Sequence, residues 1–387
     1  MITARVGGWI SWVVLLLAQA AALADALPAV RTMRVPDGGI QPQVVARGDV
    51  VHLLYFTGDP KAGDVQYARS SDGGRTFGKP MRVNSEPASA VAIGTIRGPR
   101  MAVGKGGRVH VAWMGSDRST PRAPGNQVPM LYARLNDAGD AFEPQRNVIT
   151  DHPGLDGGGT VAADDAGNVY VVWHAPEKAG NHDEGHRCVW VARSSDDGAS
   201  FAAESRANET DTGVCGCCGL EALAAEGGGL SVLYRGATEK VHRDMHLLRL
   251  DAQLKPAATR VLSELNVGIC VMSTGSLAPG HAKILAAWEG RGEVLYAPLQ
   301  SDGADVAATA PPGTAKNRKH PRLAVNDAGR TLLAWTEGTA WNRGGAIAWQ
   351  ALDEQLRPLG GPGHADGLPA WGAAAVFAAR DGFTIVY

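Results

Sequence analysis

One short phrase recurs seven times along this chain, a run of small and branched apolar residues that ends in an aromatic residue. The clearest copies are Val50-Val51-His52-Leu53-Leu54-Tyr55, Val109-His110-Val111-Ala112-Trp113 and Val169-Tyr170-Val171-Val172-Trp173, and weaker copies end at Tyr234, Trp288, Trp335 and Tyr387. These aromatic residues are 58, 60, 61, 54, 47 and 52 positions apart. A period of about 50 residues with one strand-rich unit per period predicts an all-β fold, a β-propeller. In such a fold, function belongs on the loops of one face, around the central channel.

The first 26 residues have the features of an export signal. Arg5 supplies a short positive region, Trp9 to Leu17 is almost unbroken apolar sequence, and Ala22-Leu23-Ala24 offers small residues for cleavage. We therefore expect residues 1–26 to be a signal peptide, residues 27–387 to form a single β-propeller domain, and the protein to be secreted or periplasmic. A membrane anchor is the alternative, although the apolar core is short for a span of about 20 residues.

A second phrase follows the aromatic-ended strand. It reads Ser70-Ser71-Asp72-Gly73-Gly74-Arg75-Thr76-Phe77 in the first repeat and Ser194-Ser195-Asp196-Asp197-Gly198-Ala199-Ser200-Phe201 in the third. The pattern predicts a hairpin turn in which Asp accepts backbone N–H bonds, Gly takes a positive φ and the aromatic residue packs back into the blade. These units resemble the Asp-box, or BNR, repeat of sialidase-like β-propellers. The blade-level resemblance covers nearly all of residues 27–387.

The number of blades stays open between six and seven. Each repeat is expected to supply four strands, and six full sets precede a last inner pair, Ala373 to Ala379 and Phe383 to Tyr387. An unpaired outer strand, Val30 to Val35, stands at the start. Combining the two ends in one composite blade gives seven blades, whereas the resemblance to sialidases implies six.

Loop length predicts which face is functional. Alternating strand direction puts the turn between first and second strands on the same face as the Asp-box turn, and these connections are short. The loops of the other face are longer, and long loops on a rigid scaffold usually carry binding and catalysis. We expect these loops at 56–64, 114–129, 174–189, 206–219, 264–274, 308–320, 337–346 and 359–370.

Charge and composition bear on the partners. The formal net charge is −2, which gives no reason to expect nucleic acid or an anionic membrane surface as a partner. No later stretch could span a bilayer once the signal is cleaved. We expect a monomer that binds a glycan or a protein ligand at the long-loop face.

Five cysteines map to this face, and Cys215-Gly216-Cys217-Cys218-Gly219 is the most unusual local sequence in the chain. Two disulfides with one unpaired thiol are one interpretation in an oxidising compartment. A soft-metal site for Cu(I) or Zn(II) is another, with ligands drawn, where they are not in disulfides, from Cys215, Cys217, Cys218, Cys188, Cys270 and His186, or His182. A redox-active disulfide is the third, although Cys-x-Cys is not the thioredoxin-type Cys-x-x-Cys. Exported BNR-repeat proteins with a similar Cys-x-Cys-Cys element resemble this chain.

The resemblance to sialidases implies a set of catalytic groups and no required cofactor. Sialidases bind the sugar carboxylate with three arginines and use a Tyr nucleophile with a Glu, and an Asp as acid/base. The first arginine of that pattern is missing here, because the first inner strand reads Ile40-Gln41-Pro42-Gln43. The candidates are Tyr234 with Glu239 as nucleophile and base, Asp59 or Asp64 as the acid, and the substrate-binding residues Arg97, Arg100, Arg235, Arg291 and Arg322. Tyr234 also occupies the repeating aromatic position, so blade core is the alternative for its ring.

Three functions stay open. The first is a glycoside hydrolase of exo-sialidase type that acts on exposed glycans. The second is a non-catalytic propeller that binds a glycan or a protein, and the third is a metal or thiol protein that uses Cys215, Cys217 and Cys218. Three converging arginines would favour the first, an aromatic-lined face the second, and clustered sulfur atoms the third.

Overall fold

The computed structural model describes nine stretches of the chain, namely 27–178, 180, 183–208, 212–225, 227–239, 241–280, 283–299, 307–314 and 317–387. The expected signal peptide, residues 1–26, and His182 lie outside these stretches. No helix within them has the length and apolar character to cross a bilayer.

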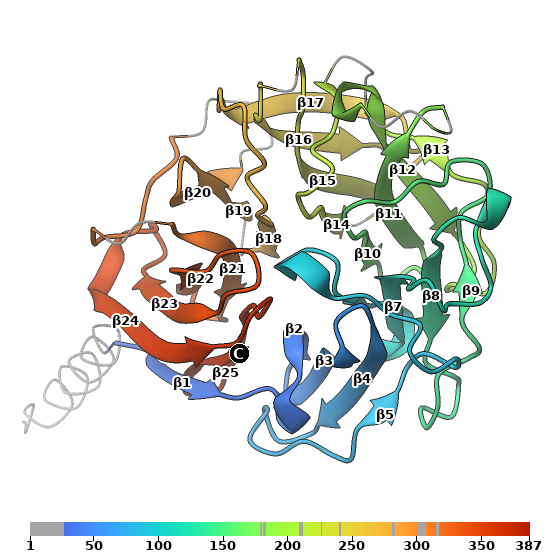
Figure 1. Cartoon of the computed structure of the whole chain (residues 1–387). Coiled ribbons are helices and arrows are strands. Elements are labelled where there is room, and N and C mark those ends of the chain that lie inside the picture. The colour runs from blue at the N-terminus through green and yellow to red at the C-terminus, as the bar shows by residue number, and fades with distance from the viewer. Residues whose placement is uncertain are drawn as a thin grey trace, which may run out of the picture.

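Seven small sheets stand around a central axis, and each sheet is one blade (Figure 1). The first three blades each have four strands. They are β2 (Ile40–Arg47), β3 (Val50–Asp59), β4 (Ala62–Ser70) and β5 (Met81–Arg82); β6 (Arg100–Val103), β7 (Val109–Met114), β8 (Met130–Arg134) and β9 (Arg146–Asn147); and β10 (Thr160–Ala163), β11 (Val169–Pro176), β12 (Arg187–Ser194) and β13 (Ser205–Arg206).

The remaining blades vary in strand number over the described residues. The fourth is β14 (Glu221–Ala225), β15 (Gly229–Arg235), β16 (Met245–Leu250) and β17 (Pro256–Ser263), and the fifth is β18 (Ser276–Pro279), β19 (Ile284–Gly290) and β20 (Glu293–Leu299). The sixth is β21 (Lys319–Val325), β22 (Thr331–Glu337), β23 (Gly345–Leu352) and β24 (Pro358–Leu368). Single-turn 3-10 helices occupy loops at Pro36–Gly38, Ile93–Thr95, Lys105–Gly107, Pro124–Asn126 and Glu184–His186.

The seventh blade is composite and closes the ring. It consists of β25 (Ala375–Ala379), β26 (Gly382–Val386) and β1 (Ala29–Met33), and β1 pairs with β26 in parallel. Beyond these strands the Tyr387 N–H donates to the Met33 carbonyl at 3.0 Å, and the Val35 N–H donates to the Tyr387 carbonyl at 3.0 Å. The seven-blade alternative is therefore right and the six-blade alternative is wrong. Five of the seven sheets have the expected four strands, and over the described residues the fifth sheet and the composite seventh sheet have three.

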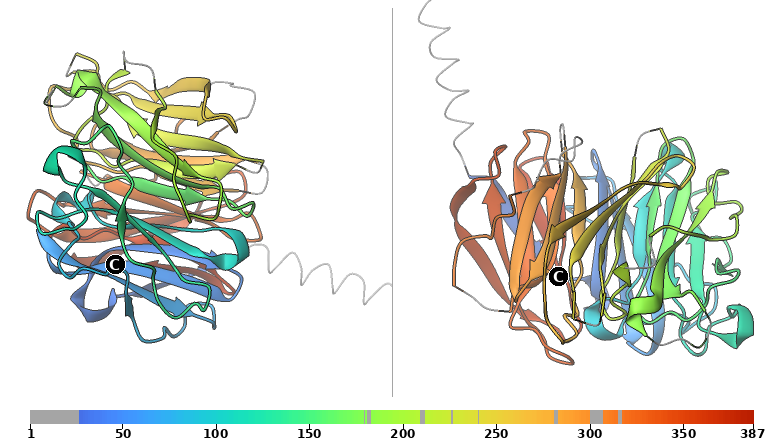
Figure 2. Two further views of the ribbon diagram at one scale, coloured as in Figure 1. Left: turned by 90° about the vertical axis from the view of Figure 1, so that its right-hand side faces the viewer. Right: turned by 90° about the horizontal axis from the view of Figure 1, so that it is seen from above.

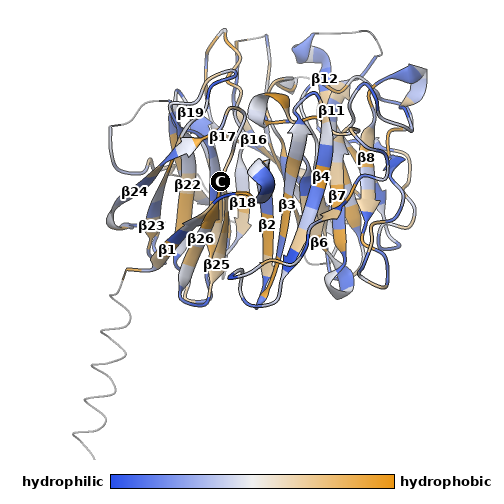
Figure 3. Cartoon of the chain, turned by 60° about the horizontal axis from the view of Figure 1, so that its bottom comes forward, coloured by the Kyte–Doolittle hydropathy of each residue, from blue (hydrophilic) through white to orange (hydrophobic). Residues whose placement is uncertain are grey.

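The core lies between neighbouring blades rather than inside any one of them. Leu54 and Phe56 of the first blade share an apolar cluster with Val111 and Trp113 of the second. All seven repeating aromatic residues are buried, from Tyr55 at 0% exposure to Tyr387 at 9%. Burying an aromatic side chain of this size stabilises the fold by about 2–3 kcal/mol. The repeat therefore supplies the contacts that hold the ring, and Figure 3 shows apolar strands between polar loops.

The Asp-box turns have the geometry that their sequences predict. The Asp72 carboxylate accepts hydrogen bonds from the Thr76 hydroxyl at 2.6 Å and from the Arg75 N–H at 2.9 Å, while Gly73 and Gly74 have positive φ. The hydroxyls of Thr76 and Ser70, with the backbone N–H groups, hold the pKa of Asp72 well below its usual range. Asp196 has the same arrangement with the Ser200 hydroxyl.

The division of the loops between two faces is also confirmed. The Gly73 N–H donates to the Asp49 carbonyl at 2.9 Å, which joins an Asp-box turn to the turn between β2 and β3. Two of the expected long loops are wrong, however. Most of 56–64 is the tight hairpin of β3 and β4, and most of 359–370 is β24. Figure 2 shows the resulting ring edge-on in two views.

Candidate functional site

Two arginines and one glutamate meet at the long-loop end of the central channel. Inner strands of all seven blades line this channel, which has a cavity volume of about 400 Å³. Glu221, at the start of β14, lies with Oε2 3.6 Å from Arg100 Nη1 and 3.9 Å from Arg322 Nη1. Burial and the charge of Arg100 lower the pKa of Arg322 to about 10, against the effect of Glu221. One carboxylate for two guanidinium groups leaves a positive charge at the channel mouth.

A groove opens beside the channel on the same face. Its cavity volume is about 370 Å³, and polar lining residues come from the β3–β4 hairpin, from the segment before β6 and from the loop after β7, namely Lys61, Arg97 and Asp117. Trp341, from the loop between β22 and β23, lines it from the other side of the ring. The Trp341 side chain is 57% exposed, and its ring meets that of Trp371 edge to face at 6.2 Å. The groove thus combines an exposed aromatic surface with charged groups of both signs.

The segment that leads into β6 builds both the groove and the channel mouth. Gly98 donates its N–H to Gln41 Oε1 at 2.8 Å, and Arg97 Nη2 lies 2.9 Å from Asp156 Oδ1. Gly94 has φ of +82°, and a Cβ there would lie 2.9 Å from Trp341 Cζ3 and 3.0 Å from Arg97 Nη1. The absence of a side chain at Gly94 lets Trp341 and Arg97 pack onto the backbone from opposite sides of the ring. This segment is drawn in cyan near the centre of the ring in Figure 1.

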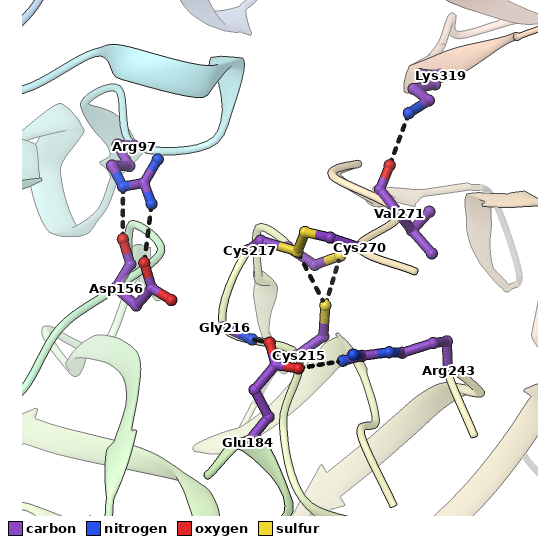
Figure 4. The surroundings of a disulfide bond; sticks show 11 residues. Arg97, Asp156, Glu184, Cys215, Gly216, Cys217, Arg243, Cys270, Val271 and Lys319 are labelled. Atoms are coloured by element: carbon purple, nitrogen blue, oxygen red, sulfur yellow. Dashed lines mark hydrogen bonds and ion pairs between the residues drawn. A yellow bond between two sulfur atoms is a disulfide. The ribbon is translucent and has the colours of Figure 1, made fainter. Parts of the chain in front are cut away.

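Four of the five cysteines form one sulfur cluster between the fourth and fifth blades (Figure 4). Cys217 and Cys270 form a disulfide that ties the loop before β14 to the loop before β18. Cys215 Sγ lies 3.4 Å from Cys217 Sγ and 3.1 Å from Cys218 Sγ. The sulfur atoms of Cys215, Cys217 and Cys218 all lie within 4.8 Å of one another.

The two free thiols of this cluster differ in acidity. Burial would raise the pKa of Cys218, but the hydrogen bond from the Cys215 thiol, the Arg235 guanidinium and the Ser273 backbone together lower it to about 6. The shared hydrogen bond and burial raise the pKa of Cys215. Cys218 is therefore the more acidic thiol of the pair, and Cys215 is the thiol that donates to it.

The cysteine expectations need correction on three points. Among the described residues there is one disulfide rather than two, and Cys188, Cys215 and Cys218 are free. Cys217 and Cys270 are candidate metal ligands only if they are not in a disulfide. They do form a disulfide here. Cys188 lies apart from the cluster, in the apolar core between the second and third blades.

The loop that contains His186 contacts the loop that contains Cys215 through the Glu184 side chain. Glu184 Oε1 accepts a hydrogen bond from the Gly216 N–H at 2.7 Å, and Glu184 Oε2 lies 2.7 Å from Arg243 Nη1. The His186 side chain is exposed, and its backbone N–H donates to Asp183. The close sulfur atoms could hold a soft metal only after reduction of the disulfide.

The candidate nucleophile and its base lie in different environments. Tyr234 is 0% exposed, its ring stacks on His246 and its hydroxyl donates to Thr212 Oγ1 at 3.2 Å. Glu239 has a 78% exposed side chain 3.8 Å from His242 Nε2. The structure thus places the Tyr234 ring in the blade core and pairs Glu239 with a surface histidine.

The candidate acids and the other arginines are also separated. Asp64 accepts hydrogen bonds from Asn84 Nδ2 at 2.7 Å and from the Ala88 N–H at 2.8 Å, which fixes the segment after β5. Asp59 is exposed at the hairpin tip and accepts from the Lys61 N–H at 3.0 Å. Arg235 is buried against Glu289 at 3.2 Å, and Arg291 is exposed in the β19–β20 turn. Of the five arginines, only Arg100 and Arg322 share a partner.

Sequence reasoning missed two features that the structure brings out. Lys61 and Asp117 were not singled out, because they meet Trp341 only when distant repeats close into a ring. Cys215 and Cys218 stand at Cys-x-x-Cys spacing, which the focus on Cys-x-Cys concealed. Spacing alone could have found that pair.

No protein-family model matches the chain, and no curated protein matches its sequence. Solved structures do resemble it. A protein of unknown function from Dyadobacter fermentans aligns with TM-score 0.55 and 14% identity over 81% of this chain and 94% of that chain. The NanB sialidase of Streptococcus pneumoniae aligns with TM-score 0.51 and 8% identity over 84% and 70%, and an α-L-arabinofuranosidase of Fusarium graminearum with TM-score 0.51 and 12% identity over 81% and 93%. At these identities the likeness shows the fold alone, a β-propeller.

Proposed function

We propose that this protein is an exported propeller that binds an acidic glycan in the groove between Lys61, Arg97, Asp117 and Trp341. The observation that carries the proposal is the exposed Trp341 ring in a cavity of about 370 Å³ beside two cationic side chains. An exposed aromatic face gives a sugar ring an apolar surface to pack on. A guanidinium and an ammonium group suit a carboxylate or sulfate on that sugar.

The fold supports the carbohydrate ligand of this proposal, and the disulfide bond supports the exported location. Solved propellers that resemble the chain include a sialidase and an α-L-arabinofuranosidase, which supports a carbohydrate ligand by analogy alone. The Cys217–Cys270 disulfide supports a secreted or periplasmic location, because disulfides persist in oxidising compartments. We propose that the propeller binds its glycan as a monomer.

Glycoside hydrolysis in the same groove is the second candidate function. Most glycosidases need two carboxyl groups that flank the scissile bond. Asp117 lines the groove, and the exposed Asp59 belongs to the hairpin that carries Lys61. These two carboxylates, rather than the buried Tyr234, are the groups on which hydrolysis here would depend.

Isothermal titration with defined oligosaccharides tests the binding proposal. The probes are sialyl and uronic-acid oligosaccharides, each compared with its neutral parent sugar. We expect the acidic sugars to bind more tightly, and Trp341→Ala to weaken binding about 10-fold or more through loss of the stacking surface, a change of about 1.4 kcal/mol. Lys61→Ala should reduce the preference for the acidic sugar over the neutral one. Val261→Ala, an exposed apolar residue on β17, is the control and should bind normally.

The outcomes separate the two candidate functions. Equal affinity of wild type and Trp341→Ala for every acidic sugar would contradict binding in this groove. Hydrolysis would be supported if wild type cleaves off the terminal acidic sugar and Asp117→Asn still binds the oligosaccharide but no longer cleaves it. If wild type binds the oligosaccharide without cleaving it, the protein is a non-catalytic propeller.

A further inference from the structure

Four sulfur atoms form a continuous chain at the boundary of the fourth and fifth blades. Cys218 Sγ lies 3.1 Å from Cys215 Sγ, Cys215 Sγ lies 3.4 Å from Cys217 Sγ, and Cys217 is bonded to Cys270. Disulfides exchange when a thiolate attacks a disulfide sulfur. The free Cys215–Cys218 pair is thus already placed against the sulfur that it would attack.

The sulfur chain runs from the protein surface into its interior. Cys270 is exposed and Cys217 is half-buried, while Cys215 and Cys218 are 1% and 3% exposed. An external thiol or disulfide can therefore reach the cluster at Cys270, whereas the Cys-x-x-Cys pair can exchange only through Cys217. A structural bridge between the two loops needs the exposed pair alone, while the buried pair packs in an apolar cluster with Ala237, Leu265 and Val271.

Buried cations surround the interior end of the chain. The side chains of Arg235 and Arg243 are 1% and 6% exposed, and the Nε atom of each has no hydrogen-bond partner among the described residues. Positive charge close to a cysteine favours the thiolate, which is the reactive form. The Cys218 pKa of about 6 agrees with this arrangement. Glu184 holds both Arg243 and the Gly216 N–H, so the reactive loop is fixed against its cationic neighbour.

We propose that Cys215, Cys217, Cys218 and Cys270 form a thiol–disulfide exchange centre, in which the disulfide moves between the exposed pair Cys217–Cys270 and the buried pair Cys215–Cys218. The proposal goes beyond glycan binding and does not depend on it. The reactant that fits the exposed sulfur is a protein or small molecule that carries a dithiol or a disulfide.

The internal transfer balances without an outside oxidant. The Cys215 thiol passes its proton to the Cys218 thiolate, and Cys215 Sγ then attacks Cys217 Sγ, which breaks the Cys217–Cys270 bond and releases Cys270 as a thiolate. The Cys218 proton passes to that thiolate, Cys218 attacks Cys215, and Cys217 leaves as a thiolate. One disulfide, one proton and the same electrons are present before and after.

The transfer has a chemical consequence at the surface. It turns the exposed disulfide into a dithiol made of Cys217 and Cys270. That dithiol can reduce a partner disulfide, giving two partner thiols and restoring the Cys217–Cys270 bond. The protein then holds two disulfides and has delivered two electrons.

Disulfide mapping of the intact protein tests the centre. The protein is held without reductant at pH 7.5, quenched in acid, alkylated with N-ethylmaleimide and mapped by mass spectrometry. We expect wild type to show both Cys217–Cys270 and Cys215–Cys218, and oxidised glutathione to lower its free thiols from the three of the present structure to one, Cys188. Cys215→Ser should show Cys217–Cys270 alone. Cys218→Ser, which blocks only the second attack, should accumulate Cys215–Cys217.

Matched variants and metal analysis decide the outcome. Cys188→Ser, which removes a buried thiol outside the cluster, should map like wild type, and circular dichroism confirms that each variant is folded. Wild type with Cys217–Cys270 alone, and with Cys215 and Cys218 still free after prolonged incubation with oxidised glutathione, would overturn the proposal. Four free thiols in the cluster with stoichiometric zinc or copper would overturn it in favour of a metal site.

Discussion

Glycines at two similar turns show how much a single residue position matters in this fold. Gly198 and Gly139 have φ of +77° and +73° in the outer turns of the third and second blades. A Cβ at Gly198 would lie 1.9 Å from the Tyr132 hydroxyl oxygen, whereas a Cβ at Gly139 would have nothing within 4 Å. The first position combines backbone strain with a clash, and the second has strain alone.

Gly198→Ala should therefore destabilise the protein more than Gly139→Ala. Left-handed backbone costs a non-glycine residue about 1–2 kcal/mol, and overpacking typically adds about 1–3 kcal/mol. We expect urea unfolding to show a loss of about 2–5 kcal/mol for Gly198→Ala and about 1–2 kcal/mol for Gly139→Ala. Equal losses would show that Tyr132 moves aside freely.

At the scale of elements, one carboxylate joins three inner strands. Glu221 of β14 lies between Arg100 of β6 and Arg322 of β21, whose side chains are 6% and 11% exposed. Removing one partner of a buried ion pair leaves an uncompensated charge and costs about 3–5 kcal/mol, and less where the pair is partly solvated. Glu221 is 21% exposed.

Glu221→Gln should lower the free energy of unfolding by about 2–4 kcal/mol, at the low end of what loss of a buried partner costs. The matched control is Glu143→Gln, since Glu143 pairs with Arg134 at 2.9 Å but is 34% exposed in the segment between β8 and β9. We expect a loss of at most about 1 kcal/mol there. Similar values for the two variants in denaturant unfolding would mean that solvent screens Glu221 well.

Local patterns predicted the strands well and the contacts between blades poorly. The aromatic-ended phrase and the Asp-box turn each depend on residues within a few positions, so both were recognisable from the sequence. The order of strands along the chain predicts a loop at 359–370, yet pairing with β23 holds most of this range as β24. Burial of Tyr234 in the blade core, and its separation from Glu239, likewise follow from packing between blades.

The candidate site was the least predictable part for the same reason. Lys61, Asp117 and Trp341 lie on the first, second and sixth blades, and only ring closure brings them to one groove. The sulfur cluster was recognised as a cluster because Cys215, Cys217 and Cys218 are adjacent in sequence. Its division into a disulfide and a dithiol depends on Cys270, which another loop supplies.

At the scale of the whole molecule, stability depends on the contacts that close the ring. Phe383 of β26 is 2% exposed in the cluster between the sixth and seventh blades, and Phe56 of the first blade is 0% exposed. Truncating a buried phenylalanine to alanine costs about 3–5 kcal/mol. We expect both Phe383→Ala and Phe56→Ala to lose this much in denaturant unfolding.

Only Phe383→Ala should also release β1, because among the described strands β1 pairs with β26 alone. Limited proteolysis should then cut near residues 27–33 in Phe383→Ala and leave that segment intact in Phe56→Ala. Early cleavage of the segment in both variants would show that the ring opens as a unit.

The parallel pairing of β1 with β26 also determines when the ring can close during synthesis. A strand near the beginning waits for a strand made more than three hundred residues later, so the ring stays open throughout synthesis. Completion of the ring is therefore tied to synthesis of β26, because β1 has no partner in the blade until that strand is made.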